Sequence, residues 1–489
     1  MDAAAAGDGY IGRKELRPRD TCIGSAGGIE FLPILMSMRP FVMSVGRQGM
    51  TGPLPRKGGS MRDACQGSSG RKMKQTAETS MRATAALLVA AAALALSGCN
   101  RHTANPAPQT MQSAPPTVKA PAGYVYITNN GEGTVSEFSR QSDGSLSFLR
   151  VAKAGAVNGP TGIVIDPASR FVYVANEGDG RIYQLGIKRD TGDLAMVGEG
   201  TVEDGAANHP QQIAITSGGD FLYVTNSGKG SDGKSSDGSI SEYAIDHATG
   251  ALKPLDTFRG SGLQQPLGIA ILPNDKFLYV SDTGAGSIVG FAIQPSGKLQ
   301  LVGSIPSLGD KPGQPGLVAV HPSGSFVYSV DRILGIVVVA KPAQDGKLTV
   351  TKTYHVGIST SGPFAIALAS VGPGVFVYTG NRGSDTISTL TVKPDASLEI
   401  AGECPTGMGY PTGMVADPAR HNLYVVSRNV ATVTQFAIAE TDGVALFPAS
   451  SIFTEDAPTE TSHPLYITTT RWDAAAPASA GQPLAQRTN

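Results

Sequence analysis

The sequence predicts an all-β fold, a seven-bladed β-propeller with four antiparallel strands in each blade. The first observation is a repeated phrase, typified by residues 159–176 (GPTGIVIDPASRFVYVAN), whose tyrosines recur 46 to 56 residues apart. A period near 50 residues indicates a repeat architecture. The repeat tyrosines are Tyr126, Tyr173, Tyr223, Tyr279, Tyr328, Tyr378 and Tyr424.

The second observation is the strand content of each repeat. A proline is followed by a short apolar run such as Ile163–Ile165, then by a turn of Pro, Gly, Asp or Ser, and then by a run of β-branched and aromatic residues. This pattern predicts two strands and a tight turn. A third run, such as Thr134–Phe138, and a fourth after a turn such as Asp143-Gly144 complete the repeat. Four short antiparallel strands repeated seven times are typical of propeller blades.

The third observation concerns the first and last repeats, which are both incomplete. Tyr124–Asn129 is a second half with no first half before it, whereas His463–Thr469 is a first half with no second half after it. Pairing the two halves would complete one blade and remove two open sheet edges, which otherwise promote aggregation. We therefore expect the ring to be closed by a C-terminal strand that completes the first blade.

The propeller is expected to span residues 123–472, and the segments before it are different in character. Residues 1–72 show neither the repeat nor a sustained helical or strand period. We interpret them as an over-extended reading frame, with the real start at Met73 or Met81; the alternative is a disordered N-terminal extension.

Residues 73–98 have the composition of a signal peptide. Lys74 and Arg82 give a basic start, residues 83–96 are apolar, and Leu96-Ser97-Gly98-Cys99 follows. The stretch is short for a transmembrane helix. LSGC resembles the lipobox of bacterial lipoproteins, in which the cysteine is lipidated. The alternative is a plain secretory signal cleaved nearby.

Residues 99–122 are rich in Pro and Ala and predict a semi-extended tether, whereas 473–489 predict a disordered tail. With lipidation at Cys99, the propeller would be a membrane-anchored lipoprotein of the cell envelope that faces the periplasm or the cell exterior. The cysteine usage agrees with this interpretation, because the predicted propeller holds only Cys404 and therefore forms no internal disulfide. We expect Cys404 to be buried and inert, since Glu403 disfavours a thiolate.

The charge balance excludes some classes of partner. The chain has 39 basic and 40 acidic side chains, and this balance argues against a nucleic-acid partner. Its 61 glycines suit a protein with many tight turns. No metal or cofactor is predicted, because no two histidines have metal-ligand spacing and no phosphate-loop, dinucleotide or GxSxG motif is present. We expect a monomer.

Several phrases resemble those of a known family. Tyr223-Val224-Thr225-Asn226 is the YVTN signature of one group of propeller repeats, and the phrases at 135–146 and 159–176 look like the seven-bladed lactonase family. This family includes 6-phosphogluconolactonases and muconate-lactonizing relatives, and the resemblance spans residues 123–472. It implies a propeller fold and, for the active members, hydrolysis of a sugar lactone.

The resemblance also implies that histidine and arginine follow the proline at the head of certain innermost strands. No such position here carries a charged side chain or a histidine, so the expected base and oxyanion donor are missing there. The two residues that follow each proline are Thr161-Gly162, Gln211-Gln212, Leu267-Gly268, Gly316-Leu317, Phe364-Ala365, Thr412-Gly413 and Leu465-Tyr466.

Other polar groups are expected on the same rim, because the loops that enter the first strand and leave the second share one face of a propeller. The candidate catalytic residues are His209, Glu177, Asp282, Asp331, Arg332, Arg382 and Arg428, and His463 and Asp179 lie on this rim as well. The alternative for part of this set is structural. Asn129, Asn176, Asn226, Asp282, Asp331 and Asn381 follow the repeat tyrosines by three places and would cap the strand ends.

Three functions remain open on the sequence. The leading one is a binding or scaffold module that recognises a small ligand or an envelope protein partner at the channel mouth. The second is a lactone hydrolase similar to 6-phosphogluconolactonase, and the third is a structural surface protein.

We predict that Cys99→Ser releases the protein from the membrane, because an acyl-modified cysteine is then lost and the tether alone has no apolar anchor. Fractionation of cells expressing each form checks this. A Cys99→Ser variant that stays in the membrane fraction to the same extent as the unaltered protein would refute the lipoprotein interpretation.

Overall fold

The structure is a computed structural model, and it describes residues 120–471 apart from 155–158, 204–208, 229–236, 261, 358–361, 408, 418, 420 and 456–461. The predictions for residues 1–72, for the signal peptide, for Cys99 and for the tail at 473–489 lie outside the described residues. Among the described residues, no helix is long and apolar enough to span a membrane.

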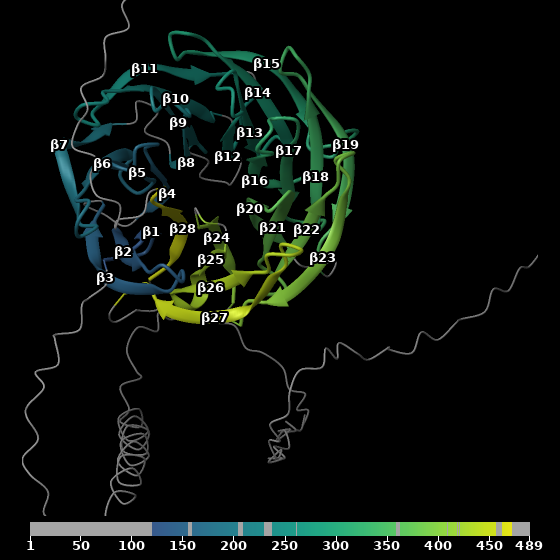
Figure 1. The fold of residues 1–489 in the computed structure, drawn as a ribbon. Helices are drawn as coiled ribbons and strands as arrows, with labels where there is room; N and C mark the ends of the chain where they lie inside the picture. Colours follow the sequence, from purple (N-terminus) through teal and green to yellow (C-terminus); the bar gives the residue numbers. More distant parts are fainter. Residues whose placement is uncertain are drawn as a thin grey trace, which may run out of the picture. The chain divides into compact units, whose positions relative to one another are not determined.

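The described chain forms seven four-stranded antiparallel sheets arranged in a ring, which confirms the predicted seven-bladed propeller (Figure 1). We number the blades 1 to 7 around the ring. Blades 1 to 3 contain β1 (Gly123–Asn129), β2 (Thr134–Arg140), β3 (Leu146–Lys153) and β28 (Pro464–Thr469); β4 (Pro160–Ile165), β5 (Phe171–Asn176), β6 (Arg181–Ile187) and β7 (Leu194–Glu203); and β8 (Pro210–Ile215), β9 (Phe221–Asn226), β10 (Ser239–Ile245) and β11 (Leu252–Arg259).

Blades 4 and 5 contain β12 (Pro266–Ile271), β13 (Phe277–Asp282), β14 (Ser287–Ile293) and β15 (Leu299–Pro306); and β16 (Pro315–Val320), β17 (Val327–Asp331), β18 (Ile336–Pro342) and β19 (Leu348–His355). Blades 6 and 7 contain β20 (Pro363–Val371), β21 (Gly374–Asn381), β22 (Thr386–Val392) and β23 (Leu398–Pro405); and β24 (Pro411–Ala416), β25 (Asn422–Ser427), β26 (Thr432–Ile438) and β27 (Ala445–Phe453), with a short 3-10 helix, η1 (Arg428–Val430), in the last blade.

The ring is closed as the two incomplete repeats predict. β28 lies beside β1 and pairs with it in antiparallel register, with Val125 opposite Thr469 and Ile127 opposite Ile467 (Figure 1). The Thr470 hydroxyl also accepts a hydrogen bond from the Tyr124 N–H, at 3.0 Å. The two ends of the repeat region therefore share one sheet, and β1 is paired on both of its edges, with β28 on one side and β2 on the other.

The innermost strands, β28, β4, β8, β12, β16, β20 and β24, follow one another around the channel, each in contact with the next. Glycine allows their close approach. A Cβ atom on Gly162 would lie 2.5 Å from the Gln211 carbonyl oxygen, and one on Gly413 would lie 2.6 Å from the Leu465 carbonyl oxygen. The glycine two places after several of the strand-head prolines is therefore a packing requirement.

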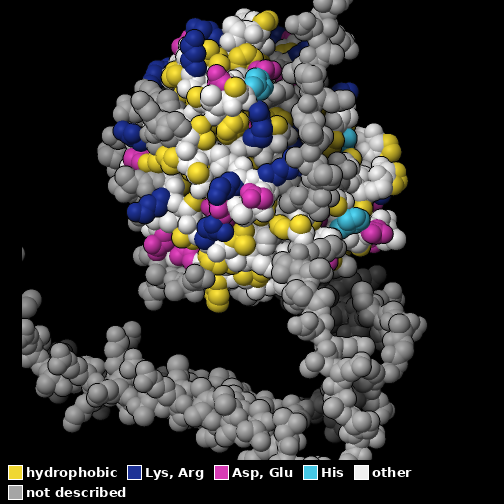
Figure 2. Space-filling view, turned by 60° about the vertical axis from the view of Figure 1, so that its left-hand side comes forward, with side chains coloured by type: hydrophobic (Ala, Val, Ile, Leu, Met, Phe, Trp, Pro, Cys, Tyr) yellow, Lys and Arg dark blue, Asp and Glu magenta, His cyan; other side chains and the backbone are white. Residues whose placement is uncertain are grey.

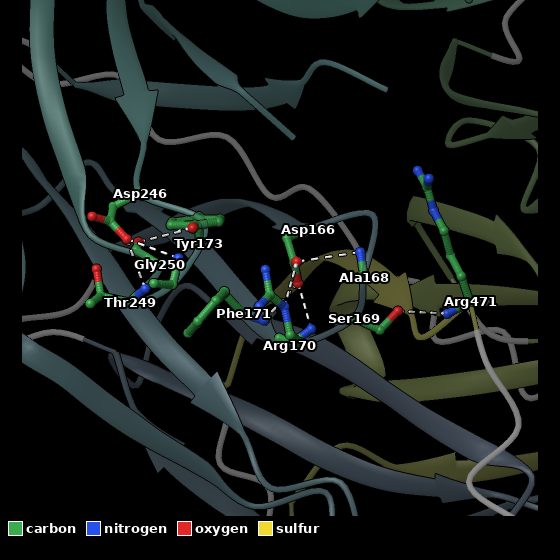
Figure 3. Close-up of polar contacts among 11 residues, drawn as sticks. Asp166, Ala168, Ser169, Arg170, Phe171, Tyr173, Asp246, Thr249, Gly250 and Arg471 are labelled. Atoms are coloured by element: carbon green, nitrogen blue, oxygen red, sulfur yellow. Dashed lines mark hydrogen bonds and ion pairs between the residues drawn. The ribbon is translucent and has the colours of Figure 1, made fainter. Parts of the chain in front are cut away.

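The repeat tyrosines join each blade to the next. In six of the seven blades, the tyrosine hydroxyl donates a buried hydrogen bond of 2.6 to 2.9 Å to a glycine carbonyl in the outer turn of the following blade. Figure 3 shows one such bond, from Tyr173 to Gly250. The donor and acceptor pairs are Tyr126–Gly192, Tyr173–Gly250, Tyr223–Gly297, Tyr279–Gly346, Tyr378–Gly443 and Tyr424–Gly144.

These turn glycines are needed for two reasons. Each has a positive φ, for example +82° at Gly346, which L-residues adopt only with strain. A Cβ atom on Gly346 would also lie 2.3 Å from the Phe277 ring. The exception is blade 5, where the Tyr328 hydroxyl is buried without a hydrogen-bond partner among the described residues. In blade 6, the turn position that carries the acceptor glycine in other blades is Ala396, at φ +65°.

A second contact between blades involves buried carboxyl groups. The Glu137 carboxylate in blade 1 accepts a hydrogen bond from the Leu194 N–H of blade 2, at 3.0 Å, and Gln184 makes the same contact to Leu252. Glu242 makes the corresponding contact to Leu299, and its Oε2 has no partner among the described residues. Burial raises the pKa of both Glu137 and Glu242 to about 7. Gln184 shows that a neutral amide fits this position.

We predict that Tyr279→Phe destabilises the propeller by about 1 kcal/mol, because it leaves the buried Gly346 carbonyl without its donor. Tyr328→Phe is the matched control. It removes a buried hydroxyl that has no partner in the described part of the chain, so the change should be neutral or stabilising. Thermal unfolding of the two variants checks this, and equal losses of stability would contradict the role we assign to the tyrosine–glycine bond.

We predict that Glu242→Gln stabilises the protein at pH 8 and has little effect at pH 5. The folded-state pKa of Glu242, about 7, lies above the ordinary value of 4.5 for a glutamate. Its contribution to stability is therefore complete below about pH 4.5 and is lost as the pH rises through about 7. Asp256 opposes ionisation and Lys298 favours it.

The glutamine variant lacks this loss, so its melting temperature should exceed that of the unaltered protein at pH 8, by a free energy on the order of 1 kcal/mol. The control is Glu399→Gln. The Glu399 carboxylate is exposed and pairs with Lys393 at 2.5 Å, so its replacement should bring no such gain in melting temperature. A melting temperature of Glu242→Gln that stays at or below that of the unaltered protein at pH 8 would contradict the prediction.

Candidate functional site at the channel mouth

One position in each repeat faces the mouth of the channel. It follows the residue that ends the second strand, and its backbone N–H donates to the carbonyl of the residue before the strand-head proline, at 2.8 to 3.3 Å in all seven blades. The seven positions, in blade order, are Asn130, Glu177, Ser227, Thr283, Arg332, Arg382 and Arg428. We call these seven residues the mouth ring.

The mouth ring is chemically one-sided. The three arginines, Arg332, Arg382 and Arg428, lie on consecutive blades 5, 6 and 7, whereas the only carboxylate of the ring, Glu177, lies on blade 2. In a ring of seven blades, blade 2 is opposite the boundary between blades 5 and 6. Glu177 therefore faces Arg332 and Arg382 across the channel.

Glu177 is held by amide donors from both neighbouring blades. The Asn130 Nδ2 donates to its Oε1 at 3.2 Å, and the Gln211 Nε2 donates to its Oε2 at 2.9 Å. The Gln211 amide in turn contacts the His209 carbonyl, at 3.2 Å. Each carboxylate oxygen keeps a further lone pair, so an oriented Glu177 can still accept a proton from a water molecule.

Arg382 is fixed between two aromatic rings. Its Cζ lies 3.3 Å from the centroid of the Phe364 ring and 4.7 Å from the centroid of the Tyr410 ring. The Tyr410 backbone is in the left-handed region, at φ +71°, which is a strained conformation for a residue with a side chain. This stacking restricts the plane of the guanidinium and leaves its N–H groups available at the ring edge.

Arg332 and Arg382 lie close enough to influence each other. Burial is the main cause that lowers the pKa of Arg382, to about 10, and the charges of Arg332 and Arg428 act in the same direction. Burial also lowers the pKa of Arg332. Both guanidinium groups stay protonated at neutral pH. No ion pair joins either of them to a carboxylate within the described residues, although the Asp331 charge acts on Arg332. With Arg428 beside them, this side of the mouth carries more positive than negative charge.

The hydrogen-bonding groups here are mainly donors without acceptors. The buried Nε atoms of Arg332 and Arg382 and the Nε2 of Gln212 have no hydrogen-bond partner among the described residues. Buried donors are rarely left unpaired in proteins, because each costs free energy. Three unpaired donors beside two like charges favour a ligand rich in oxygen acceptors, and in particular an anion.

Tyr466 and Gln212 form the floor of the mouth. Tyr466 is 7% exposed, and its hydroxyl lies near Gln212 and within the electrostatic influence of Arg382, Glu177 and Arg332. These two residues also line a channel cavity of about 160 Å³, together with Ile163, Leu317, Met414 and other inner-strand residues. This volume is below that of most ligand pockets, so a sugar-sized ligand would bind above Tyr466 rather than beneath it.

Two of the sequence candidates have a structural role. Asp282 accepts hydrogen bonds from the Gln264 and Gln265 N–H groups, at 2.7 and 2.8 Å, and Asp331 accepts them from Gln314, Ile333 and Leu334, at 2.6 to 3.0 Å. These bonds fix the loops on either side and correspond to the capping alternative. Both carboxylates are buried and committed to backbone donors, and neither is available as a base.

The other rim candidates divide between the mouth and the turns. Asp179 accepts a hydrogen bond from the Tyr183 hydroxyl, at 2.5 Å, in its own turn. The backbone carbonyls of His209 and His463 accept the hydrogen bonds from the N–H groups of the mouth-ring residues Ser227 and Asn130. The His463 Nδ1 is buried without a partner among the described residues. Arg428 occupies the mouth-ring position of blade 7. The structure therefore brings together Glu177, Arg332 and Arg382 from the candidate set.

Six residues of the site are absent from the candidate set: Asn130, Gln211, Gln212, Phe364, Tyr410 and Tyr466. Four of them follow a strand-head proline but are neither histidine nor charged, Tyr410 precedes such a proline, and Asn130 occupies the mouth-ring position of blade 1. Their signal was the break in the repeat itself. Gln212 and Tyr466 replace residues that are small or apolar at the same place in the other blades.

The described residues show no grouping of three or more His, Cys, Asp or Glu side chains that could hold a metal ion. Burial raises the pKa of the Cys404 thiol to about 11, with Glu403 acting in the same direction. This environment disfavours the thiolate, as expected from the sequence. On the face drawn in Figure 2, acidic and basic side chains are mixed with apolar ones.

The family model described as lactonase, 7-bladed beta-propeller, matches residues 85–207, 258–364 and 318–447, and these segments together cover more than half of the chain. No curated protein matches this chain.

Several solved structures share the fold. A candidate 6-phosphogluconolactonase of Bacteroides uniformis has a TM-score of 0.60 at 20% identity, over 71% of this chain and 99% of that one. A second, from Bacteroides fragilis, has a TM-score of 0.59 at 19% identity, over 73% and 100%. The periplasmic gluconolactonase of Pseudomonas aeruginosa has a TM-score of 0.58 at 19% identity, over 71% and 98%. At these identities the likeness is one of fold.

Proposed function

This chain belongs to the seven-bladed β-propeller lactonase family, and from that premise we propose that its channel mouth binds a sugar lactone or the corresponding sugar acid and hydrolyses the lactone. The observation that carries the proposal is the placement of an oriented carboxylate, Glu177, across the mouth from Arg332 and Arg382, whose buried N–H donors have no acceptor in the described chain.

Each group has a definite role in this proposal. Arg332 and Arg382 hold the oxygen atoms of the ligand and stabilise the negative charge that develops on the carbonyl oxygen when a nucleophile attacks. Glu177 removes a proton from the attacking water, which adds to the lactone carbonyl. The ring C–O bond then breaks, and the leaving oxygen takes up the proton that Glu177 had accepted, which gives the open-chain acid and restores the carboxylate. Asn130 and Gln211 keep the Glu177 carboxylate oriented for this step.

This arrangement differs from the one that the family resemblance implies. The base and the oxyanion donors come from the mouth ring instead of the strand heads, where the sequence has no histidine or charged residue. A second candidate function follows from the same observation. If these groups bind a sugar acid without turning over a lactone, the protein is a binding module for small anionic ligands.

We also propose that the protein is held to a membrane of the cell envelope through Cys99 and faces the periplasm or the exterior as a monomer. The basic, apolar and LSGC segments at 73–99 support this. The periplasmic location in the name of the Pseudomonas aeruginosa neighbour is compatible with it.

We predict that the purified full chain hydrolyses glucono-lactone, plain or phosphorylated, faster than the spontaneous rate. Glu177→Gln should lower kcat by about 10²- to 10⁴-fold while gluconate binding is largely retained, because the change removes the base and keeps the shape. Arg382→Gln should lower kcat/KM by about 10²-fold or more and weaken gluconate binding as well. Rates are followed by acid release, and binding by calorimetry.

The exposed Glu399→Gln variant is the control for the loss of a carboxylate, and melting temperatures verify that each variant is folded. Gluconate binding without hydrolysis in the unaltered protein would favour the binding module. The absence of both binding and hydrolysis, or full activity in Glu177→Gln and Arg382→Gln, would refute the site.

A further inference from the structure

We propose that Tyr466, the mouth residue contributed by the closing strand β28, donates a hydrogen bond to the bound ligand, and that ligand binding and ring closure are coupled as a result. The inference rests on the proposed function, since it concerns the ligand that binds above this residue. Tyr466 follows a strand-head proline but is neither a histidine nor charged, and it lies on the strand that closes the ring.

Tyr466 stands out among the residues at its position in the repeat. The second residue after the strand-head proline is small or apolar in most blades, so the channel would otherwise be open at this level. The seven residues in blade order are Tyr466, Gly162, Gln212, Gly268, Leu317, Ala365 and Gly413. Tyrosine is the only one of the seven with a hydroxyl group, and it is the largest.

The surroundings of the phenol are those of a hydrogen-bond donor. Burial raises the pKa of Tyr466, so the hydroxyl keeps its proton at neutral pH. Arg382 and Arg332 lie on one side and Glu177 lies on the other, and the charges of all three act on this hydroxyl. A ligand oxygen held by the arginines above the floor would therefore meet the Tyr466 O–H and the unpaired Gln212 Nε2.

The backbone around Tyr466 is fixed by the closure itself. Its N–H donates to the Thr128 hydroxyl of β1, at 3.2 Å, and the His463 carbonyl accepts from the Asn130 N–H, at 2.9 Å. The Thr412 hydroxyl of β24 donates to the Pro464 carbonyl, at 3.2 Å. When β28 detaches from β1, the Tyr466 hydroxyl leaves the site together with the strand.

A ligand that contacts Tyr466, Arg382 and Glu177 together joins blade 1 to blades 6 and 2, and this set of contacts exists only in the closed ring. Anything that binds only the closed form reduces the population of the open form by a factor of 1 + [L]/Kd. At ten times Kd, amide hydrogens of β28 that exchange through detachment of the strand should exchange about tenfold more slowly.

The experiment uses the full chain with gluconate as the probe, and compares the unaltered protein with Tyr466→Phe. Tyr354→Phe, in the outer strand β19, is the matched control. We expect Tyr466→Phe to weaken gluconate binding about tenfold or more and to leave the melting temperature without ligand unchanged. In the unaltered protein and in Tyr354→Phe, gluconate should slow exchange in the peptide that contains β28 and leave the peptide that contains β15 unchanged.

Equal gluconate affinity in Tyr466→Phe and the unaltered protein would overturn the binding role of Tyr466. Protection spread equally over β28 and β15, or no protection of β28 at saturating gluconate, would overturn the coupling. Both results leave the proposed function standing, because binding is still observed. Absence of gluconate binding in the unaltered protein would instead overturn the proposed function and this inference with it.

Discussion

The hydrogen bond from a repeat tyrosine to a glycine carbonyl of the next blade is the interaction on which the ring depends. Each bond is buried, it crosses an interface between blades, and it requires a glycine at positive φ in the receiving turn. Because the same pair recurs in six blades, the angle between successive blades is set in the same way around the ring. Seven successive blades, six of them joined to the next by this bond, bring β28 beside β1, and the closing strand then completes the first sheet.

The site that we propose lies where the side chains of the repeat differ from blade to blade. The mouth-ring position has the same backbone hydrogen bond in all seven blades, so the scaffold places seven side chains around one opening regardless of their identity. The sequence fills these places unevenly, with arginine on three consecutive blades and glutamate on the opposite side. A regular scaffold with irregular side chains thus yields a polar, one-sided site without any change in the backbone.

The outcome for the candidate residues has a physical reason. Asp282 and Asp331 satisfy backbone N–H groups that would otherwise be buried without a partner, so their carboxylates serve the loops. Glu177, at the next place in the repeat, is free of that task and points into the mouth, where Asn130 and Gln211 orient it. A shift of one residue along the turn therefore separates a structural carboxylate from the one that we propose acts on the ligand.

The sequence by itself determined the fold class, the number of blades and the strand that closes the ring. Strands and turns are encoded in local periodicity, and the number of repeats of about 50 residues gives the number of blades. It also placed Glu177, Arg332 and Arg382 on one rim. Only the tertiary structure decided which of the rim residues meet. Tyr466 lies beside Gln212 and near Arg382 because the ring closes by pairing β1 with β28, whose residues are more than 300 positions apart in the sequence. The stacking of Arg382 on Phe364 and Tyr410 depends on the directions of side chains from separate loops. Local sequence patterns carry no information on such distances, since contacts across the channel are set by the sum of all seven blade packings.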